Sequence, residues 1–423
     1  PEVVLHNACT GCAVCVGVCP ANALQAVERS GVHVPELDVH KCTSCHLCLE
    51  VCPEVSSSGD NYAKGFFVLR HDFARLTQAT FGFSPNDPWL GHCRHYYLAH
   101  SRDETLRYSS ASGGAVTTLL TSMLREGYIE GAVVVEMNPD DPLRPLVFIA
   151  RTEEEIIRAA RSKYCPVPLG VVIREVLRFT GRVAVVGLPC HVRGFRKAAI
   201  RLPSLDARIA CYVGLVCFHS VTFHGTRFLL ARLGLAPENV TRIEYRGRGW
   251  PGSIEIKMKD GARHVVAYNE AWGSVFGFFS PLSCFTCYDG ANELADISVG
   301  DAWIPGLRRD YGRNPGESLL LVRSDVGEHV LTTAVENGLL ELLPLEREDV
   351  LASLRGPLVR KKHCYTARLR AMRWLGLSTP EIDANVKSSI RAYLHSLSIL
   401  LQFLHSGRSS EVMPIYAPPA FSD

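Results

Sequence analysis

The chain has 423 residues, of which 47% are hydrophobic and 21% are charged, and its formal net charge is +2. This composition is typical of a folded globular protein with two or three domains and a sizeable core. The sequence contains no run of eighteen consecutive apolar residues, so we expect no membrane span. No basic segment followed by an apolar stretch begins the chain, so we predict no signal peptide and a cytoplasmic location.

The first sixty residues differ from the rest in charge and in cysteine content. Residues 1–60 carry a net charge of −5 and the remainder carries +7, a pairing that suits an acidic electron carrier joined to a basic body. The chain contains 16 cysteines, and half of them lie in two runs within this segment. In a long chain without a signal peptide, such clustering favours metal binding in a reducing compartment over disulfides.

The two cysteine runs have the same spacing. One consists of Cys9, Cys12, Cys15 and Cys19 followed by Pro20, and the other of Cys42, Cys45, Cys48 and Cys52 followed by Pro53. This is the bacterial two-cluster ferredoxin pattern, in which the fourth cysteine of each run ligates the other cluster. We therefore expect one 4Fe–4S cluster on Cys9, Cys12, Cys15 and Cys52, and a second on Cys42, Cys45, Cys48 and Cys19. Zinc is the alternative, but zinc sites usually use pairs of CxxC.

Helical and strand patterns alternate from residue 105 onward. Helices are expected over 113–126, 167–179 and 222–234 and from His191, with strands at 132–135, 183–186 and 209–216. This alternation predicts an α/β domain with a mainly parallel sheet. Three further strand patterns, at 242–245, 253–258 and 262–267, follow one another directly and predict an antiparallel sheet.

These patterns divide the chain into four parts. The fold class is α/β (α+β): a small bacterial-type ferredoxin domain at 1–60 precedes a mixed α/β domain at 105–360. Residues 56–60 read as a linker, and the aromatic-rich segment 61–104, which shows no clear period, is expected to bridge the two domains. Residues 361–423 form an extension, in which a leucine-rich helix is predicted over 387–405.

The segment 247–252 matches the letters of a GxGxxG motif. A dinucleotide-binding fingerprint must open a helix, whereas here Pro251 is followed by a strand pattern. We therefore predict a turn at this position.

Eight cysteines lie outside the two runs. Cys190 and Cys217 each follow a predicted strand, and the ends of neighbouring parallel strands meet at one sheet edge. Together with Cys284 and Cys287 they could hold a third cubane. Buried structural cysteines are an equal alternative, because free cysteine is common in protein cores.

Six short segments have a recognisable pattern: Ser109–Gly114, Ser162–Tyr164, Gly187–Cys190, Gly214–Cys217, Cys284–Cys287 and Glu293–Asp301. Through these segments, residues 1–60 and roughly 100–345 resemble the beta subunits of coenzyme F420 hydrogenases and dehydrogenases, a family in which F420 denotes a deazaflavin. Two features depart from the family pattern, namely Cys165 and the extension after about residue 360.

The resemblance implies FAD, coenzyme F420 as the substrate, and three 4Fe–4S clusters in total. The third cluster is then assigned to Cys190, Cys217, Cys284 and Cys287. The implied contacts of FAD and coenzyme are Ser110, Ser112, Gly113, Gly114, Ser162, Lys163, Tyr164, Gly187, Pro189 and Arg193.

Two of the implied flavin contacts have alternative interpretations. Ser112–Gly114 begins a predicted helix, where free amides and the helix dipole suit a pyrophosphate, although an ordinary helix cap is the alternative. Lys163 and Tyr164 are implied beside the flavin ring, and a solvated helix-end lysine is the alternative for Lys163.

Two basic stretches also have two interpretations each. Arg193, Arg196, Lys197 and Arg201 either form a solvated helix face or attract the anionic tail of the coenzyme. The stretch from Arg355 to Arg373 favours a docking surface over nucleic acid, because the chain as a whole is nearly neutral and no nucleic-acid motif is present. The apolar helix at 387–405 either packs on its own core or binds a partner.

The predicted function is therefore that of an iron–sulfur flavoprotein subunit. The resemblance implies hydride transfer between coenzyme F420 and FAD, followed by electron relay through the clusters to or from a partner redox subunit. Such a partner could be a hydrogenase, a heterodisulfide-reductase-like protein or a quinone- or phenazine-reducing complex. No side chain is assigned as acid or base. Two alternatives are a ferredoxin-driven flavin reductase of another molecule, such as a chlorophyll derivative, and a polyferredoxin-like wiring subunit without an active site.

Overall fold

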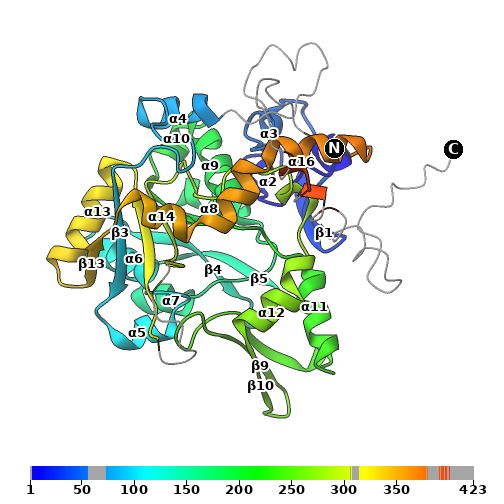
Figure 1. Cartoon of the computed structure of the whole chain (residues 1–423). Helices are drawn as coiled ribbons and strands as arrows, with labels where there is room; N and C mark the ends of the chain where they lie inside the picture. Colours follow the sequence, from blue (N-terminus) through cyan, green and yellow to red (C-terminus); the bar gives the residue numbers. More distant parts are fainter. Residues whose placement is uncertain are drawn as a thin grey trace.

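The computed structural model describes residues 2–55, 73–304, 306, 314–377 and 379, together with 390, 392–394, 396, 397 and 400. A small cysteine-rich domain at the N-terminus precedes a large α/β domain and a helical segment (Figure 1). The linker predicted at 56–60 lies outside the described residues. The described members of the helix predicted over 387–405 are helical, and Leu401 and Leu404 lie outside the described set.

The cysteine-rich domain is built from two similar halves around one hairpin. Its elements are the short helices α1 (Glu2–Leu5), α2 (Val14–Gly17) and α3 (Leu47–Glu50) and the antiparallel strands β1 (Leu24–Arg29) and β2 (Val32–Leu37). Ala13 and His46 both adopt a left-handed conformation, with φ values of 57° and 60°, directly after the second cysteine of their runs. The repeated cysteine spacing therefore produces a repeated backbone turn.

The large domain is built on an eight-stranded mixed sheet. Its order is β13-β3-β12-β11-β7-β6-β4-β5, and the four neighbours β11, β7, β6 and β4 run parallel. The strand bounds are β3 (His95–Ser101), β4 (Gly131–Met137), β5 (Pro145–Ala150), β6 (Val183–Gly187), β7 (Ile209–Leu215), β11 (Ile297–Asp301), β12 (Ser318–Val322) and β13 (Leu340–Pro344). The predicted α/β class is confirmed.

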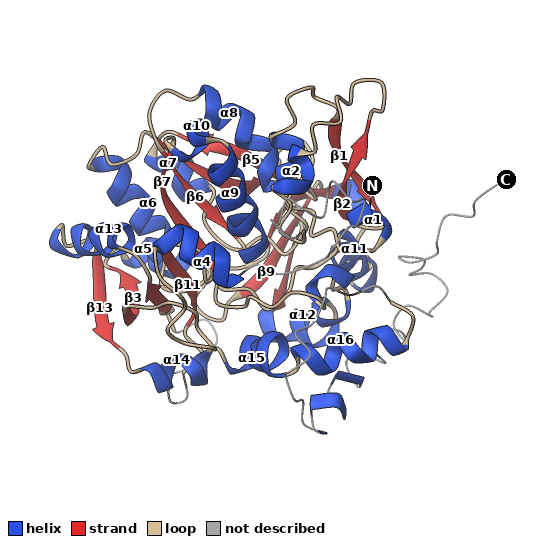
Figure 2. Cartoon of the chain, turned by 90° about the horizontal axis from the view of Figure 1, so that it is seen from above, coloured by secondary structure: helices blue, strands red, loops and turns tan. Residues whose placement is uncertain are grey.

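Helices cover both faces of this sheet (Figure 2). On one face, α6 (Ala115–Arg125) and α13 (Asp325–Glu336) pack through residues such as Leu119 against alternate positions of the strands. On the other face, α8 (Ile173–Arg178) and α9 (Pro189–Arg201) pack through residues such as Phe195. The central strands are apolar on both sides, as expected for parallel strands between two helical layers. The remaining elements around the sheet are α4 (Phe73–Phe81), α5 (Glu104–Ser109), α7 (Glu153–Arg158), η2 (Leu169–Val172), α10 (Pro203–Asp206) and α14 (Arg347–Ser353).

A second, three-stranded sheet extends from the large domain at the bottom of Figure 1. Its strands β8 (Val240–Glu244), β9 (Ser253–Met258) and β10 (Arg263–Ala267) are antiparallel, as predicted. Around it lie α11 (Phe223–Arg232), α12 (Tyr268–Ser274), η3 (Pro237–Asn239) and η4 (Phe276–Phe278). Residues 247–252 form bends between β8 and β9, and the Ser253 amide donates to the Gly247 carbonyl oxygen at 3.2 Å. The chain therefore turns here and no helix opens, as predicted.

The segment assigned to a bridge contributes to the large domain. Strand β3 lies within residues 61–104 and pairs with both β12 and β13 inside the main sheet. The predicted domain start at residue 105 is therefore too late. The sequence of this strand, HYYLAHS, shows no regular alternation of apolar and polar side chains that would have predicted it.

The helical segment after β13 folds back onto the large domain. It comprises α15 (Arg355–Leu358), the π-helix η6 (Val359–His363) and α16 (Tyr365–Trp374), which pack beside the short helix η5 (Leu282–Cys284). Arg360, Lys361 and Arg368 are buried there. The interpretation of the basic stretch as an exposed docking surface is wrong for these three residues.

Among the described residues, none of the helices combines the length and apolar character needed to cross a membrane.

The cysteine-rich domain is packed tightly on the large domain. A Cβ atom added at Gly17 would lie 1.9 Å from the carbonyl oxygen of Gly170, so only glycine fits at this contact. The Arg174 guanidinium donates hydrogen bonds to the carbonyl groups of Val16, at 2.9 Å, and Cys19, at 3.3 Å. The first cysteine run is thereby held at a fixed place beside η2 and α8.

Candidate functional site

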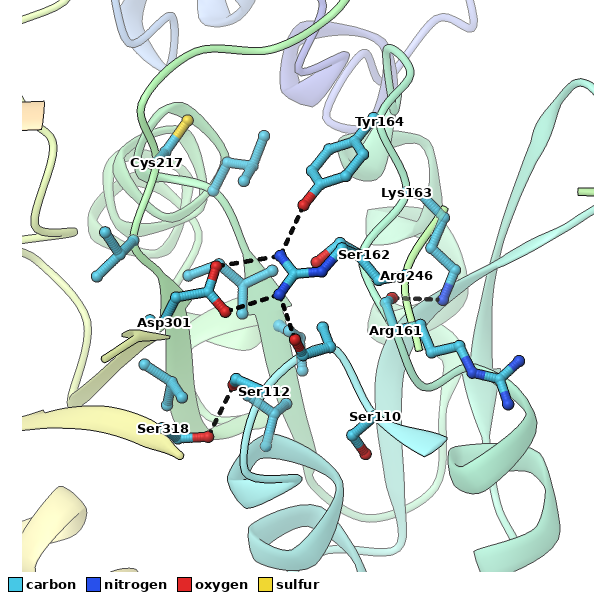
Figure 3. Close-up of a pocket in the computed structure, with 18 of the residues that line it drawn as sticks. Ser110, Ser112, Arg161, Ser162, Lys163, Tyr164, Cys217, Arg246, Asp301 and Ser318 are labelled. Carbon is cyan, nitrogen blue, oxygen red and sulfur yellow. Dashed lines mark hydrogen bonds and ion pairs between the residues drawn. The ribbon is translucent and has the colours of Figure 1, made fainter. Parts of the chain in front are cut away.

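A cavity of about 650 Å³ opens at the carboxyl ends of β6, β7 and β11. This is the edge of an open α/β sheet at which ligands bind. Its walls include the predicted residues Ser110, Ser112, Gly114, Ser162, Lys163, Tyr164 and Gly187, together with Cys217 (Figure 3). The geometry therefore brings together segments that lie far apart in the sequence.

The first turn of α6 forms one wall of this pocket, with Gly114, Ala115, Val116 and Thr117 among the lining residues. A Cβ atom at Gly113 would lie 2.4 Å from the carbonyl oxygen of Ala99, so the chain passes too close to β3 for a side chain. The Gly113 amide donates to the Ser318 hydroxyl at 3.0 Å, and the Ser112 hydroxyl lies 2.9 Å from the same group. Gly113 supports this turn and does not line the pocket.

A buried ion pair forms the floor of the pocket (Figure 3). The Arg246 side chain is only 1% exposed and donates to both carboxylate oxygens of Asp301, at 2.9 and 3.1 Å. It also donates to the Tyr164 hydroxyl at 2.9 Å and to the carbonyl oxygen of Ala111. The indole of Trp250 donates to Asp301 at 3.0 Å. This network fixes β8, β11 and the segment containing Tyr164 relative to one another.

Lys163 lies in the pocket wall, with its ammonium directed at the end of α7. It donates to the carbonyl groups of Ala159, of Ala160 at 2.8 Å, and of Arg161 at 2.9 Å. Burial, together with the nearby Arg161 charge, lowers the pKa of Lys163 to about 7. Lys163 is therefore half-buried, with its ammonium bonded to backbone carbonyl groups, unlike the solvated lysine considered as the alternative. The neighbouring Cys165 also lines the pocket, and burial raises the pKa of its thiol to about 12.

Three buried polar atoms of the pocket walls have no hydrogen-bond partner within the described part of the chain. They are Nε of Arg246, Nε2 of His219 and Nε1 of Trp272. The other ring nitrogen of His219 donates to the Ser220 carbonyl at 2.8 Å, which leaves Nε2 as an acceptor. Burial lowers the pKa of His219 to about 3, so this ring is neutral. Buried polar groups are normally paired, so these atoms favour a polar ligand in the cavity.

Cys190, Cys217, Cys284 and Cys287 lie close to one another beside this pocket. Cys190 lies at the start of α9, Cys217 follows β7, Cys284 is the last residue of η5, and Cys287 follows that helix. Burial raises the pKa of the Cys190 thiol, and nearby Cys12, Cys217, Cys287 and Cys284 raise it further. Among the described residues, no three His, Cys, Asp or Glu side chains are arranged to hold a single metal ion.

The Cys190 turn is fixed by the histidine that follows it. The Leu188 amide donates to Nδ1 of His191 at 3.2 Å, and Nε2 of the same ring donates to the Val167 carbonyl at 3.1 Å. Burial lowers the pKa of His191 to about 4, so the neutral ring holds both bonds. Pro189 begins α9 next to this turn and does not line the pocket.

Several thiols of the N-terminal domain lie close enough to one another to interact. Burial raises the pKa of the Cys15 thiol, and Cys12, Cys9, Cys52 and Cys48 add to this rise. Burial also raises the pKa of the Cys48 thiol, with further contributions from Cys45 and Cys19. The fourth cysteine of each run thus lies near the other run, as the spacing predicts. Cys42 and Cys45 are exposed at the surface.

The basic stretch after Cys190 faces the cysteine-rich domain. Arg193 forms a buried ion pair with Glu54, and Lys197 donates to the carbonyl groups of Cys52 and Val55, both at 2.6 Å. The solvated face considered for this stretch is wrong for Arg193 and Lys197, which are buried. Arg193 does not line the pocket, because its side chain is directed toward the domain interface.

Several pocket residues are not predicted by the sequence, above all Arg246, His219 and Trp272. Asp301 enters only as the last residue of a motif. Arg246 directly precedes the glycine-rich turn at 247–252. A charged residue next to such a turn is the one feature of the sequence that could have marked Arg246 as a candidate pocket residue. His219 lies two residues after Cys217, and nothing in its sequence context separates it from an ordinary core histidine.

Comparison with known proteins connects these two sites to one family. Models for the N-terminal and C-terminal parts of the coenzyme F420 hydrogenase/dehydrogenase beta subunit match residues 96–174 and 180–348. The chain belongs to this family of beta subunits. A model for a 4Fe–4S dicluster domain matches residues 3–57, which places the iron–sulfur domain where the cysteine spacing predicts it. The chain is thus an oxidoreductase of the F420 hydrogenase/dehydrogenase type.

Relatives within the F420 hydrogenase/dehydrogenase family include two beta subunits of curated hydrogenases. Coenzyme F420 hydrogenase subunit beta of Methanothermobacter thermautotrophicus is 28% identical over 299 residues, which cover 69% of this chain and 99% of the relative. The protein of the same name from Methanosarcina barkeri is 26% identical over 290 residues, which cover 65% of this chain and 90% of the relative. A chain of the F420-reducing NiFe hydrogenase complex from Methanosarcina barkeri has the same fold, with a TM-score of 0.55 and 24% identity over 71% of this chain and 99% of that chain.

Proposed function

We propose that this chain transfers a hydride between coenzyme F420 and FAD and relays electrons through three 4Fe–4S clusters to or from a partner redox protein. One observation carries the proposal: Cys217 belongs both to the wall of the pocket and to the third cysteine group. An electron leaving the pocket therefore meets that group directly. The same group neighbours Cys12 of the N-terminal domain.

The pocket residues fit a flavin dinucleotide. The cavity volume lies within the range of cofactor sites, and the first turn of α6 presents helix amides and the positive end of its dipole to an anionic group. The three unpartnered polar atoms of Arg246, His219 and Trp272 offer hydrogen bonds to a heterocyclic ring or its polar tail.

Each part of the pocket has a separate role in this proposal. Ser112, Gly114 and the helix amides would hold the pyrophosphate, while Ser162, Lys163 and Tyr164 would contact the ring. When bound, FAD exchanges a hydride with the deazaflavin and single electrons with iron–sulfur clusters. The Arg246–Asp301 pair keeps the floor rigid, and the apolar walls exclude water from the reacting groups.

The arrangement of the thiols suggests the order of the relay. Cys190, Cys217, Cys284 and Cys287 adjoin the pocket, and the group that includes Cys12 is next. The remaining group includes the exposed Cys42 and Cys45 and would face a partner redox protein. The Gly17–Gly170 contact keeps the two domains at a fixed separation, which suits electron transfer between them.

The test begins with anaerobically purified protein. We expect about twelve iron atoms and one FAD per chain, by the ligand count of three cubanes. Reduced coenzyme F420 should then bleach the flavin absorbance and reduce the clusters. In Cys217→Ser the flavin should still bleach, but cluster reduction should be lost or strongly slowed. Cys211→Ser, a change of a cysteine in the preceding strand β7, serves as the matched control.

The alternatives have different outcomes. Flavin that is bleached by a chemical reductant but not by reduced F420 would favour a flavin reductase of another molecule. Protein that contains iron but no flavin would favour a wiring subunit without an active site. Either result would overturn the proposal.

A further inference from the structure

The segment after the matched family region places three cations against the third cysteine group. The C-terminal family model ends at residue 348, and the elements α15, η6 and α16 follow it. Arg360, Lys361 and Arg368 on these elements are buried beside the loop that carries Cys284 and Cys287. A sequence segment outside the family match therefore completes the surroundings of these cysteines.

Lys361 contacts a cysteine sulfur directly. Its ammonium lies 3.2 Å from Sγ of Cys287 and donates to the carbonyl oxygen of Asp289 at 2.9 Å. The side chain is almost fully buried. Within the described part of the chain, no carboxylate forms an ion pair with Lys361, whereas the adjacent Lys362 pairs with Glu293 at 2.5 Å. The Cys287 sulfur thus contacts Lys361 directly, whereas the buried Glu54 interacts with its charge without forming an ion pair.

Arg368 and Arg360 hold the segment in this position. Nε of Arg368 donates to the carbonyl oxygen of Phe285 at 2.5 Å, and its Nη1 donates to the carbonyl oxygen of Arg360. The Arg360 guanidinium lies 4.8 Å from the centre of the Phe285 ring and 5.0 Å from that of Phe218. The loop between the two cysteines is therefore tied to the helices that carry Lys361.

Burying an ammonium without a negative partner is expensive, by several kcal/mol as an order of magnitude. A neutral Cys287 thiol would leave Lys361 with weak acceptors only. A thiolate that ligates a cluster supplies the missing negative charge. The reduced cluster carries one more negative charge than the oxidised cluster, so a fixed cation beside it stabilises the reduced form more. Hydrogen bonds to sulfur and local charge are known levers on cluster potential.

We propose that Lys361 is a positioning residue that raises the reduction potential of the cluster held by Cys190, Cys217, Cys284 and Cys287. The inference rests on the proposed third cluster. It also assigns a role to the segment Arg355–Trp374. This segment would place a positive charge beside the cluster and would not serve as an exposed docking surface. Reduction of the cluster would need no proton from Lys361, because its ammonium would keep its charge beside the thiolates.

The experiment is an anaerobic redox titration followed by electron paramagnetic resonance. In Lys361→Met we expect a lower midpoint potential for this cluster alone, by about 59 mV, which corresponds to a tenfold change in the ratio of reduced to oxidised cluster. Lys361→Arg, which keeps the charge, should restore most of the shift. Arg373→Met removes an exposed cation from the same helical segment and should leave the potential unchanged.

The iron content distinguishes failure of the proposed third cluster from failure of the proposed role of Lys361. Wild-type protein with only about eight iron atoms would mean that the proposed third cluster is absent. Lys361→Met with about twelve iron atoms and an unaltered potential would overturn the role of Lys361 and leave the proposed function standing. If Lys361→Met loses iron, Lys361→Gln keeps an N–H donor without the charge. A wild-type potential in Lys361→Gln would equally overturn the inference.

Discussion

The amide of Gly170 donates a hydrogen bond of 2.7 Å to the carbonyl oxygen of Cys12, so the large domain is bonded to the loop that carries the first cysteine run. Both partners are backbone groups, and the surrounding contacts are too close for side chains. A Cβ atom at Gly170 would lie 2.3 Å from the backbone nitrogen of Val14. The two domains therefore behave as one rigid unit at this point.

Gly17→Ala should loosen this interface. The new methyl group would overlap the Gly170 carbonyl, and overpacking of this kind costs typically 1–3 kcal/mol. We expect easier proteolytic release of the N-terminal domain and slower cluster reduction by reduced F420, with the iron content retained. Gly273→Ala is the control, because nothing lies within 4 Å of its added Cβ atom. Equal behaviour of the two variants would contradict the interface described above.

Asp301→Asn should destabilise the pocket. The change leaves the Arg246 guanidinium buried without its negative partner, and breaking such a pair costs on the order of 3–5 kcal/mol. We expect a lower midpoint in denaturant unfolding and loss of bound flavin. The exposed pair of Arg125 and Glu153 provides the control, since Glu153→Gln should change stability by less than about 1 kcal/mol. A similar loss in both variants would argue against a special role for the buried pair.

The lowered pKa of Lys163 should make the stability of the folded chain depend on pH. Its pKa is lowered to about 7 in the folded chain, so between pH 7 and its ordinary value the unfolded chain binds more protons. Stability should therefore rise with pH across that window, by up to about 1.4 kcal/mol per pH unit from this group. Denaturant unfolding at pH 7 and pH 9 measures the slope. In Lys163→Met this contribution should disappear, and an unchanged slope would count against the buried position of the amine.

Cys190→Ala tests the third cysteine group. Removing one ligand should reduce the iron content from about twelve to about eight atoms per chain while the two N-terminal clusters remain. Cys211→Ala removes a buried thiol from strand β7, six residues before Cys217, and should leave all of the iron in place. Iron analysis together with the low-temperature resonance spectrum provides the measurement. Unchanged iron in Cys190→Ala would remove this residue from the ligand set.

Much of the fold could be predicted because its signals are local. The repeated cysteine spacing determines the turns at Ala13 and His46, and the apolar runs of β4, β6 and β7 match strands buried on both faces. Strand β3 could not be predicted because its identity depends on pairing with β12 and β13, which come more than two hundred residues later. The sequence of β3 alone does not indicate which distant strands it pairs with.

The candidate site was predictable only in part, for a related reason. Ser112 and Lys163 stand in short segments that resemble a known family, so their places could be expected. Arg246 forms its buried ion pair with Asp301, which lies on another sheet. A pair between residues so far apart in the sequence cannot be predicted from a local pattern. The environment of Lys361 could not be predicted because a run of basic residues is usually solvated, and only its tertiary position beside Cys287 reverses that expectation.

The insertion of β3 between β12 and β13 limits how this molecule could be cut or recombined. A fragment beginning at residue 105 would lack the strand that joins β13 to the rest of the sheet. It would also uncover the backbone edge of β12, and such edges promote self-association. Any exchange of the electron-carrying module with that of another protein would therefore have to place its junction before His95.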